Sequence, residues 1–191
     1  MRARAESARA TRHQIIGTML ELCLHRWYDE ITMRELATQS GVALQTVINH
    51  FGTKEGVFAA MLEDPRFQAE FGGQRWKAAS GDIHGAVELL MQDYEHAGDA
   101  IIRFLALESR IPSLADILAF GRRRHRAWLE RTFPAALVGR TSADREHQLL
   151  LLICATDAYT WKLLRRDQGL SQDETTARVT ELVDMLRRRI D

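Results

Sequence analysis

The helical spacing of apolar residues restricts the fold of this chain more than any other feature. Apolar side chains recur at positions i, i+3, i+4 and i+7 in residues 83–94, and similar spacing returns in residues 114–129 and 179–190. This spacing makes one face of an α-helix apolar. The alternation typical of strands is nearly absent. The sequence therefore predicts an all-α fold of about nine helices.

Glycine, proline and capping residues predict where these helices begin and end. Gly98 is predicted to separate two helices, and Asp64-Pro65 is predicted to disturb another, because proline removes a backbone donor. Ser171 and Glu174 form the pattern of a capping box before the last helix. The predicted helices cover about residues 8–27, 33–39 and 44–50, a helix that begins after Thr53, and then 83–96, 99–109, a long helix between Pro112 and Pro134, 144–167 and 172–190.

The composition of the chain excludes some classes of protein. The 26 basic residues balance the 26 acidic ones, which excludes a polybasic protein but allows a local basic site. Residues 1–13 carry a net charge of +3, which fits either an arm that binds nucleic acid or a solvated helix start. No apolar run reaches the ~18 residues of a membrane span. Cys23 and Cys154 lie far apart in apolar segments and are predicted to be buried thiols. We therefore expect a soluble, cytoplasmic protein.

Residues 31–58 place two short helices around one glycine. Thr32 and Glu35 have the spacing of a reciprocal capping pair, so a helix is predicted to begin at Met33. Gly41 is predicted to end it in a left-handed conformation, where glycine has no steric cost. Thr53 is predicted to cap a further helix, whose free N–H groups together with Lys54 would bind a phosphate.

The second short helix has one apolar face and one polar face. At 100° per residue, Val47 and Phe51 point inward while Gln45 and Asn49 point outward. Amide side chains match the donor and acceptor of adenine in the major groove, and Ile48 could meet a thymine methyl. Taken singly these residues mean little, but together with the capped helices they predict a helix-turn-helix that binds DNA.

The string T-x-x-x-L-A-x-x-x-G-V-x-x-x-T-V-x-x-x-F-x-x-K-E, from Thr32 to Glu55, resembles the tetracycline-repressor (TetR) family of bacterial transcriptional regulators. The segment DAYTWKLLRRDQGLSQDETTARVTELVDML is more weakly similar to the last two helices of that family. The resemblance implies an all-helical homodimer with a DNA-binding domain over residues 1–60 and a ligand-binding and dimerisation domain over 61–191. It also implies the DNA-binding residues, which are Thr32, Arg34, Gln45, Thr46, Ile48, Asn49, His50 and Lys54.

Two positions depart from the family pattern. Ala43 stands where Ser or Thr is common. The second short helix, which is the recognition helix in this family, therefore lacks a side-chain cap that is worth on the order of 1 kcal/mol. Ile48 stands where an aromatic residue, most often Tyr, is usual, so a hydroxyl contact to the DNA backbone is missing. The second departure affects the operator sequence rather than the mode of binding.

The run LLLLIC, from Leu149 to Cys154, is apolar around the whole helix circumference and must be covered on both sides. We expect a homodimer through the helices at about 144–167 and 172–190. A central helix buried within a monomer is the alternative.

The ligand site is harder to read from the sequence. Asp157 is predicted to share an apolar stripe with Leu150, Cys154 and Trp161, where it would pair with an arginine or a tyrosine or meet a polar or cationic effector. The run GRRRHR at 121–126 is either a solvated face paired with acids or a site for an anionic effector. The candidate ligand-binding residues, each of which could also be ordinary core, are Tyr94, Phe104, Phe120, Trp128, Asp157 and Trp161.

Catalytic and metal-binding patterns are not found. The seven histidines are scattered without a metal-ligand spacing, and neither a phosphate loop nor a nucleophile elbow appears. We expect no cofactor, no metal and no enzymatic activity. A helical enzyme and a protein-binding module remain the rival classes, but the latter leaves Gln45 and Asn49 unexplained. The sequence thus predicts a regulator, more often a repressor than an activator, that binds a palindromic DNA duplex as a dimer and is released by an unidentified small-molecule effector.

Overall fold

The structure, a computed structural model, describes residues 2–137 and 141–188, and over these ranges it contains helices and turns but no strand. The all-α prediction is confirmed. The α-helices are α1 (Arg2–His25), α2 (Met33–Gln39), α3 (Leu44–Phe51), α4 (Lys54–Leu62), α5 (Pro65–Glu70), α6 (Ile83–Leu107), α7 (Pro112–Thr132), α8 (Ser142–Thr156), α9 (Ala158–Lys162) and α10 (Gln172–Arg188). Short 3-10 turns lie at Tyr28–Glu30, Gln74–Lys77 and Pro134–Leu137, and a π-helical turn follows α9 at Leu163–Asp167.

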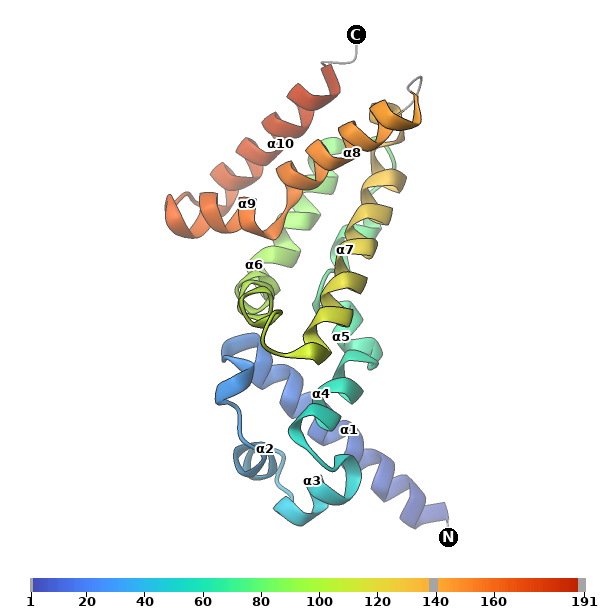
Figure 1. Ribbon diagram of the computed structural model, residues 1–191, viewed down its shortest axis with the longest axis vertical. Helices are drawn as coiled ribbons and strands as arrows, with labels where there is room; N and C mark the ends of the chain where they lie inside the picture. Colours follow the sequence, from blue (N-terminus) through green and yellow to red (C-terminus); the bar gives the residue numbers. More distant parts are fainter. Residues whose placement is uncertain (1, 138–140, 189–191) are drawn as a thin grey trace.

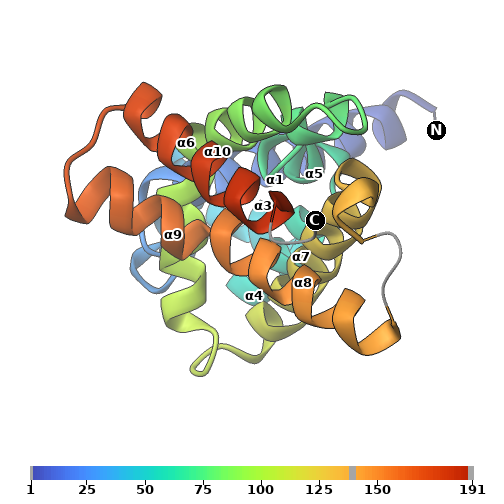
Figure 2. The same cartoon turned by 90° about the horizontal axis from the view of Figure 1, so that it is seen from above.

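The helices form an elongated molecule with two ends (Figure 1). Helices α1 to α4 occupy one end and α8 to α10 the other, while α6 and α7 run between them. Seen from above, α8 and α10 lie side by side on the outside of the second end (Figure 2). The last predicted helix ends at Arg188, and residues 189 and 190 of that prediction lie outside the described residues.

Two clusters of buried side chains hold these ends together. One joins α1 to α5 and also takes in Phe104, Leu107 and Leu114 from the ends of α6 and α7 that face it. The other is built from α6 to α10 around Trp128 and Trp161. The predicted domain division at residues 60 and 61 falls inside α4, and it stays a prediction.

Helix α6 is continuous through Gly98, so the predicted break at that glycine is wrong. A Cβ atom built on Gly98 would lie 2.5 Å from Cζ3 of Trp161. The glycine therefore allows the indole of α9 to pack directly on the backbone of α6. Its role is close approach between helices rather than helix termination.

The predicted helix over 144–167 is in fact two helices that meet at Asp157. The backbone of Asp157 is extended, with φ −72° and ψ 153°, and its Oδ1 accepts a hydrogen bond from the Tyr159 N–H at 2.8 Å. The carboxylate therefore caps α9 instead of pairing with an arginine or a tyrosine. Helix α8 also begins earlier than predicted, at a capping box formed by Thr141 and Asp144.

The break at Asp157 changes the direction of the side chains on either side of it. Trp161 is fully buried, whereas Leu150 and Cys154, which were predicted to share its stripe, are exposed. The prediction of two buried thiols is therefore right for Cys23 and wrong for Cys154. Among the described residues, no helix is both long enough and apolar enough to cross a membrane.

Candidate functional site

Helices α2 and α3 are oriented by the turn between them. Thr32 Oγ1 accepts a hydrogen bond from the Glu35 N–H at 3.1 Å, as predicted, but the Glu35 carboxylate pairs with Arg26 instead of reaching back to Thr32. Gly41 has φ +64°, which is the left-handed conformation predicted for it. Val42 follows, and its N–H donates to the Ala37 carbonyl at 3.0 Å. The turn thus fixes the angle at which α3 leaves α2.

Helix α3 presents a polar face to the outside. Val47 is fully buried, while Gln45 and Asn49 are exposed and Ile48 keeps 39% of its surface accessible. The Gln45 amide donates from Nε2 to Asn49 Oδ1 at 2.9 Å, so the two amides form one exposed pair. Ala43, at the N-cap position, makes no side-chain cap. The arrangement presents amide donors and acceptors at the spacing of one helical turn.

The remaining predicted DNA-binding residues differ in how far they are exposed to solvent. Thr32 and Arg34 are exposed at the start of α2, whereas Thr46 and His50 are half-buried on the flanks of α3. Arg12 of α1 is exposed as well and lies over the Phe51 ring at 5.3 Å. Arg2 and Arg4, which contribute to the charge of the N-terminal segment, have side chains outside the described residues.

Lys54 lies differently from a simple solvent-exposed lysine. Thr53 caps α4 as predicted, accepting from the Gly56 N–H at 3.2 Å. The Lys54 ammonium donates to the Tyr28 carbonyl at 2.9 Å and lies 4.4 Å from the centre of the Tyr28 ring. It also donates to the Asp29 carbonyl at 3.4 Å. Its contacts also tie α4 to the turn before α2.

A cavity of about 410 Å³ lies among α5, α6 and α7 and is closed by the junction of α8 and α9. This volume is within the range of pockets that bind small molecules. Four of the six predicted ligand-binding residues line it, and these are Tyr94, Phe104, Phe120 and Asp157. Trp128 and Trp161 do not line it. They are fully buried in the second core cluster.

Helix α5 contributes a wall of the cavity that was not predicted from the sequence. Phe67 and Phe71 line the cavity and stack on each other with ring centres 4.4 Å apart. The spacing of four residues after Pro65 places both rings on one helical face. This spacing was the signal available in the sequence.

A network of buried polar groups lies at the other end of the cavity. Arg75 Nε donates to Asp93 Oδ2 at 2.8 Å, and Arg75 Nη1 lies 3.1 Å from His125 Nδ1. His125 Nε2 lies 2.9 Å from Thr156 Oγ1, and the Tyr94 hydroxyl donates to the Thr156 carbonyl at 3.0 Å. Burial and the charge of Arg75 lower the pKa of His125 to about 3, so this imidazole is neutral. Burial raises the pKa of Tyr94 to about 12.

The run at 121–126 contains two arginines that pair with acids and two that lie over the Phe120 ring. Arg122 pairs with Glu108, and Arg126 pairs with Glu146. Arg123 and Arg124 face the cavity, where both guanidinium groups lie about 6 Å from the centre of the Phe120 ring. Among the described residues, no group of three or more His, Cys, Asp or Glu side chains could hold a metal ion.

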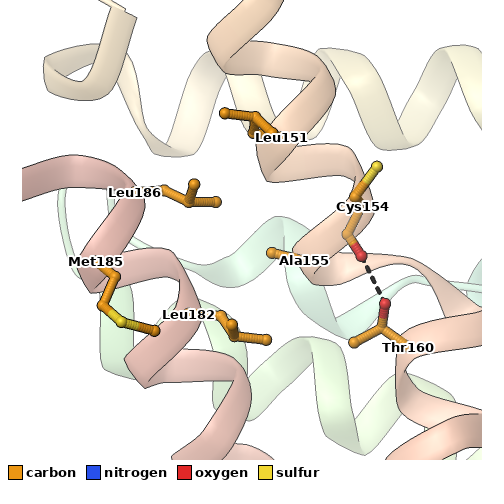
Figure 3. A pocket seen from close by; sticks show the side chains of 7 residues that line it. All are labelled: Leu151, Cys154, Ala155, Thr160, Leu182, Met185 and Leu186. Atoms are coloured by element: carbon orange, nitrogen blue, oxygen red, sulfur yellow. Dashed lines mark hydrogen bonds between the residues drawn. The ribbon is translucent and has the colours of Figure 1, made fainter. Parts of the chain in front are cut away.

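An apolar hollow lies on the outer face of α8 and α10 (Figure 3). Its volume is about 670 Å³. Leu150 and Met185, one on each helix, keep 50% and 51% of their surfaces exposed. The residues that line the hollow are Leu151, Cys154, Ala155, Thr160, Leu182, Met185 and Leu186.

Comparison with known proteins agrees with this geometry. The sequence profile of "Bacterial regulatory proteins, tetR family" matches residues 15–61. A transcriptional regulator from Rhodococcus sp. has the same fold, with a TM-score of 0.69, 18% identity, and coverage of 93% of this chain and 96% of that one. A TetR-family regulator from Streptomyces coelicolor gives a TM-score of 0.69, 17% identity, and coverage of 95% and 88%.

A further structure of this fold carries a ligand. It is a protein from Saccharomonospora viridis, described as a transcriptional regulator in complex with choline, with a TM-score of 0.70, 17% identity, and coverage of 91% and 95%. No curated protein matches this chain.

The capped α2, the left-handed turn and the polar face of α3 define a helix-turn-helix protein of the all-helical class. The profile match covers that helix-turn-helix, and the fold is shared with solved structures over more than nine-tenths of the chain. Residues 15–61 match the TetR family of bacterial regulatory proteins, and the chain shares its fold with solved structures described as transcriptional regulators.

Proposed function

We propose that this regulator is a repressor that binds a palindromic operator as a homodimer and is released by a small-molecule effector. The exposed amide pair of Gln45 and Asn49 on α3 is the observation that carries the proposal. Two amides held one turn apart on the outer face of a short helix match the adenine edge in the major groove. Arg34, Arg12 and Lys54 lie around that face in positions suited to phosphate contacts.

A dimer supplies the second recognition helix. One helix that reads a few base pairs binds with modest affinity, so helix-turn-helix proteins pair on half-sites about one turn of DNA apart. The exposed apolar face of α8 and α10 supports a two-fold contact between protomers, in which Leu150 and Met185 of each become covered. In this proposal residues 1–60 bind DNA, and residues 61–191 bind the effector and form the dimer.

The cavity supports release by an effector because its wall is also part of the DNA-binding end. Phe67 of α5 lines the cavity and belongs to the core shared with α1 and α4. Beside it, Arg66 donates to the His13 carbonyl of α1 at 3.1 Å. An effector that shifts α5 therefore favours one position of α1 over another, and DNA is released to the extent that the effector prefers that state. The choline complex of the Saccharomonospora viridis protein supports a small molecule as the effector.

Selection of bound duplexes from a random-sequence pool tests the proposal. We expect a two-fold palindrome to be enriched by the purified protein. Asn49→Ala should cost about 1–3 kcal/mol of operator binding and relax the preference at one base pair of each half-site. Gln92→Ala, which removes an exposed amide from α6, is the matched control and should leave the preference unchanged.

Lys54→Ala should weaken binding to all sequences alike, because a phosphate contact carries no sequence information. It should also lower stability, since Lys54 bonds the Tyr28 carbonyl. An unchanged operator preference in Asn49→Ala would show that α3 does not read the bases. Absence of any enriched duplex at low salt would reject the regulator proposal.

A further inference from the structure

We infer that the cavity binds an amphipathic organic anion, with its carboxylate at Arg123 and Arg124 and its apolar body between α5 and α6. The inference names the chemical class of the effector and in that respect rests on the proposed function. Three observations carry it: the apolar end of the cavity, the arginines at its rim, and the guanidinium groups that lie over three of its aromatic rings.

The end of the cavity nearest the DNA-binding helices is apolar. Phe67 and Phe71 stack there, and the Phe104 ring lies 5.8 Å from that of Phe71. Ile117 and Leu118 of α7 complete this part of the wall. An apolar ligand body that fills this space removes aromatic and aliphatic surface from water.

The polar groups at the opposite end are mostly satisfied within the protein. Arg75 is neutralised by Asp93, and His125 bonds both Arg75 and Thr156. Arg122 and Arg126, at the rim, are paired with acids. A ligand therefore meets few open donors or acceptors in the depth of the cavity.

Two further arginines, Arg123 and Arg124, line the cavity at the rim. Within the described part of the chain Arg123 forms no ion pair, and it lies over Phe120. Arg124 is half-buried, and burial together with the charge of Arg75 lowers the pKa of its guanidinium. A carboxylate placed between Arg123 and Arg124 would give Arg123 an ion pair and would favour the charged form of Arg124. Guanidinium groups bind carboxylates by charge-assisted, often bidentate hydrogen bonds.

The same geometry disfavours a cationic ligand. A quaternary ammonium binds over open aromatic faces, but here guanidinium groups already lie over Tyr94, Trp76 and Phe120. Among the residues that the structure describes, Asp157 is the one acid that lines the cavity, and its Oδ1 already caps α9. The arginines at the rim would also repel a cationic ligand.

Isothermal titration of the full chain, without DNA, tests the inference. The probes are butanoate, octanoate and dodecanoate, with 1-octanol as the uncharged match and choline as the cation. We expect a carboxylate to bind at least about tenfold more tightly than the alcohol, because a hydrogen bond to a charged group is worth that much. The affinity should rise with chain length until the apolar end is filled.

Substitutions locate the carboxylate. Arg123→Gln and Arg124→Gln should each weaken octanoate binding at least about tenfold while leaving 1-octanol binding unchanged. Arg110→Gln, an exposed arginine that does not line the cavity, is the matched control. Thermal melting of each variant shows whether it is folded, and the comparison of octanoate with 1-octanol on the unaltered chain does not depend on any variant.

The outcomes separate this inference from the proposed function. Binding of 1-octanol or choline as tight as that of octanoate, or no binding by any carboxylate, overturns the anionic class while leaving the DNA-binding proposal intact. Binding of octanoate that depends on Arg123 and Arg124 supports it, even if no duplex is ever enriched. Release of a selected duplex by octanoate would support both the proposed function and the anionic class of effector.

Discussion

His125 has to stay neutral to keep both of its hydrogen bonds, since its Nδ1 faces the cationic Arg75 and its Nε2 faces Thr156. Its pKa is lowered to about 3, below the ordinary value near 6.5, by burial first and by Arg75 second. The unfolded chain therefore takes up this proton more readily than the folded one. The stabilising contribution is fully present above about pH 6.5 and declines as the pH falls toward 3.

We predict that this imidazole steepens acid unfolding. Between about pH 6.5 and pH 3 it should add a slope approaching 1.4 kcal/mol per pH unit to the free energy of unfolding. His125→Asn should lower stability near pH 7 but flatten that slope. Urea unfolding over a pH series measures both effects, with His84→Asn, at an exposed position, as control. If His125→Asn kept the slope of the unaltered chain, another group would control the acid response.

The two cysteines show what a sequence can predict for a single residue. Cys23 lies on the inner face of an uninterrupted helix, where spacing alone predicts burial, and burial raises the pKa of its thiol to about 12. Cys154 ends the run 149–154, which is apolar on every side of the helix, so spacing does not tell which side faces water. Only the positions of α9 and α10 decide that it is exposed.

Element boundaries were predictable where the signal is local. Thr32, Gly41 and Thr53 act within three or four residues of themselves, and the helices they delimit begin and end as predicted. The helix boundaries near Gly98 and Asp157 were predicted wrongly. Gly98 packs against a distant residue, and Asp157 caps a new helix within a segment whose apolar spacing predicts one continuous helix. Gly98 accommodates Trp161, which is far along the chain, and nothing within α6 itself marks that contact.

The close approach of α6 and α9 leads to a prediction about stability. Gly98→Ala would place its Cβ 2.5 Å from the indole of Trp161, so the two helices must move apart. We expect a loss of about 1–3 kcal/mol, as for other overpacked sites. Gly121→Ala is the matched control, since Gly121 lies within α7 with open space around it. There alanine should stabilise the helix by about 0.5–1 kcal/mol. Thermal and urea unfolding of both variants compare the two effects, and equal stabilities would show that the indole can shift freely.

At the scale of the whole molecule, the outer face of α3 was predictable and the cavity was not. The directions of Gln45, Val47 and Asn49 follow from helix geometry within a single short segment. The cavity needs α5, α6, α7 and the α8–α9 junction to be placed relative to one another. Aromatic residues on these helices gave no sign of which would line it, so Trp128 and Trp161 were as plausible as Tyr94 and Phe104.

The face of α8 and α10 carries the last prediction, which concerns assembly. If two protomers cover this face, Met185→Glu places a charge in the apolar contact of each. We expect the dimer to dissociate about a hundredfold or more readily, because an unpaired charge buried at an interface costs several kcal/mol. Sedimentation at a series of concentrations measures the change. Ala177→Glu, an exposed position of the same helix, adds the same charge away from the residues that line the hollow.

Cys154 provides a second, independent readout of the same contact. Its thiol lines the hollow and is exposed in one chain, so a maleimide should label it in Met185→Glu but not in the assembled protein. Cys23 serves as the internal reference, since it is buried and should stay unlabelled in both. Equal labelling of Cys154 in the unaltered protein and in Met185→Glu would mean that this face is open to water. Two-fold binding of DNA would then have to arise from another surface, because a monomer presents a single α3 to the duplex.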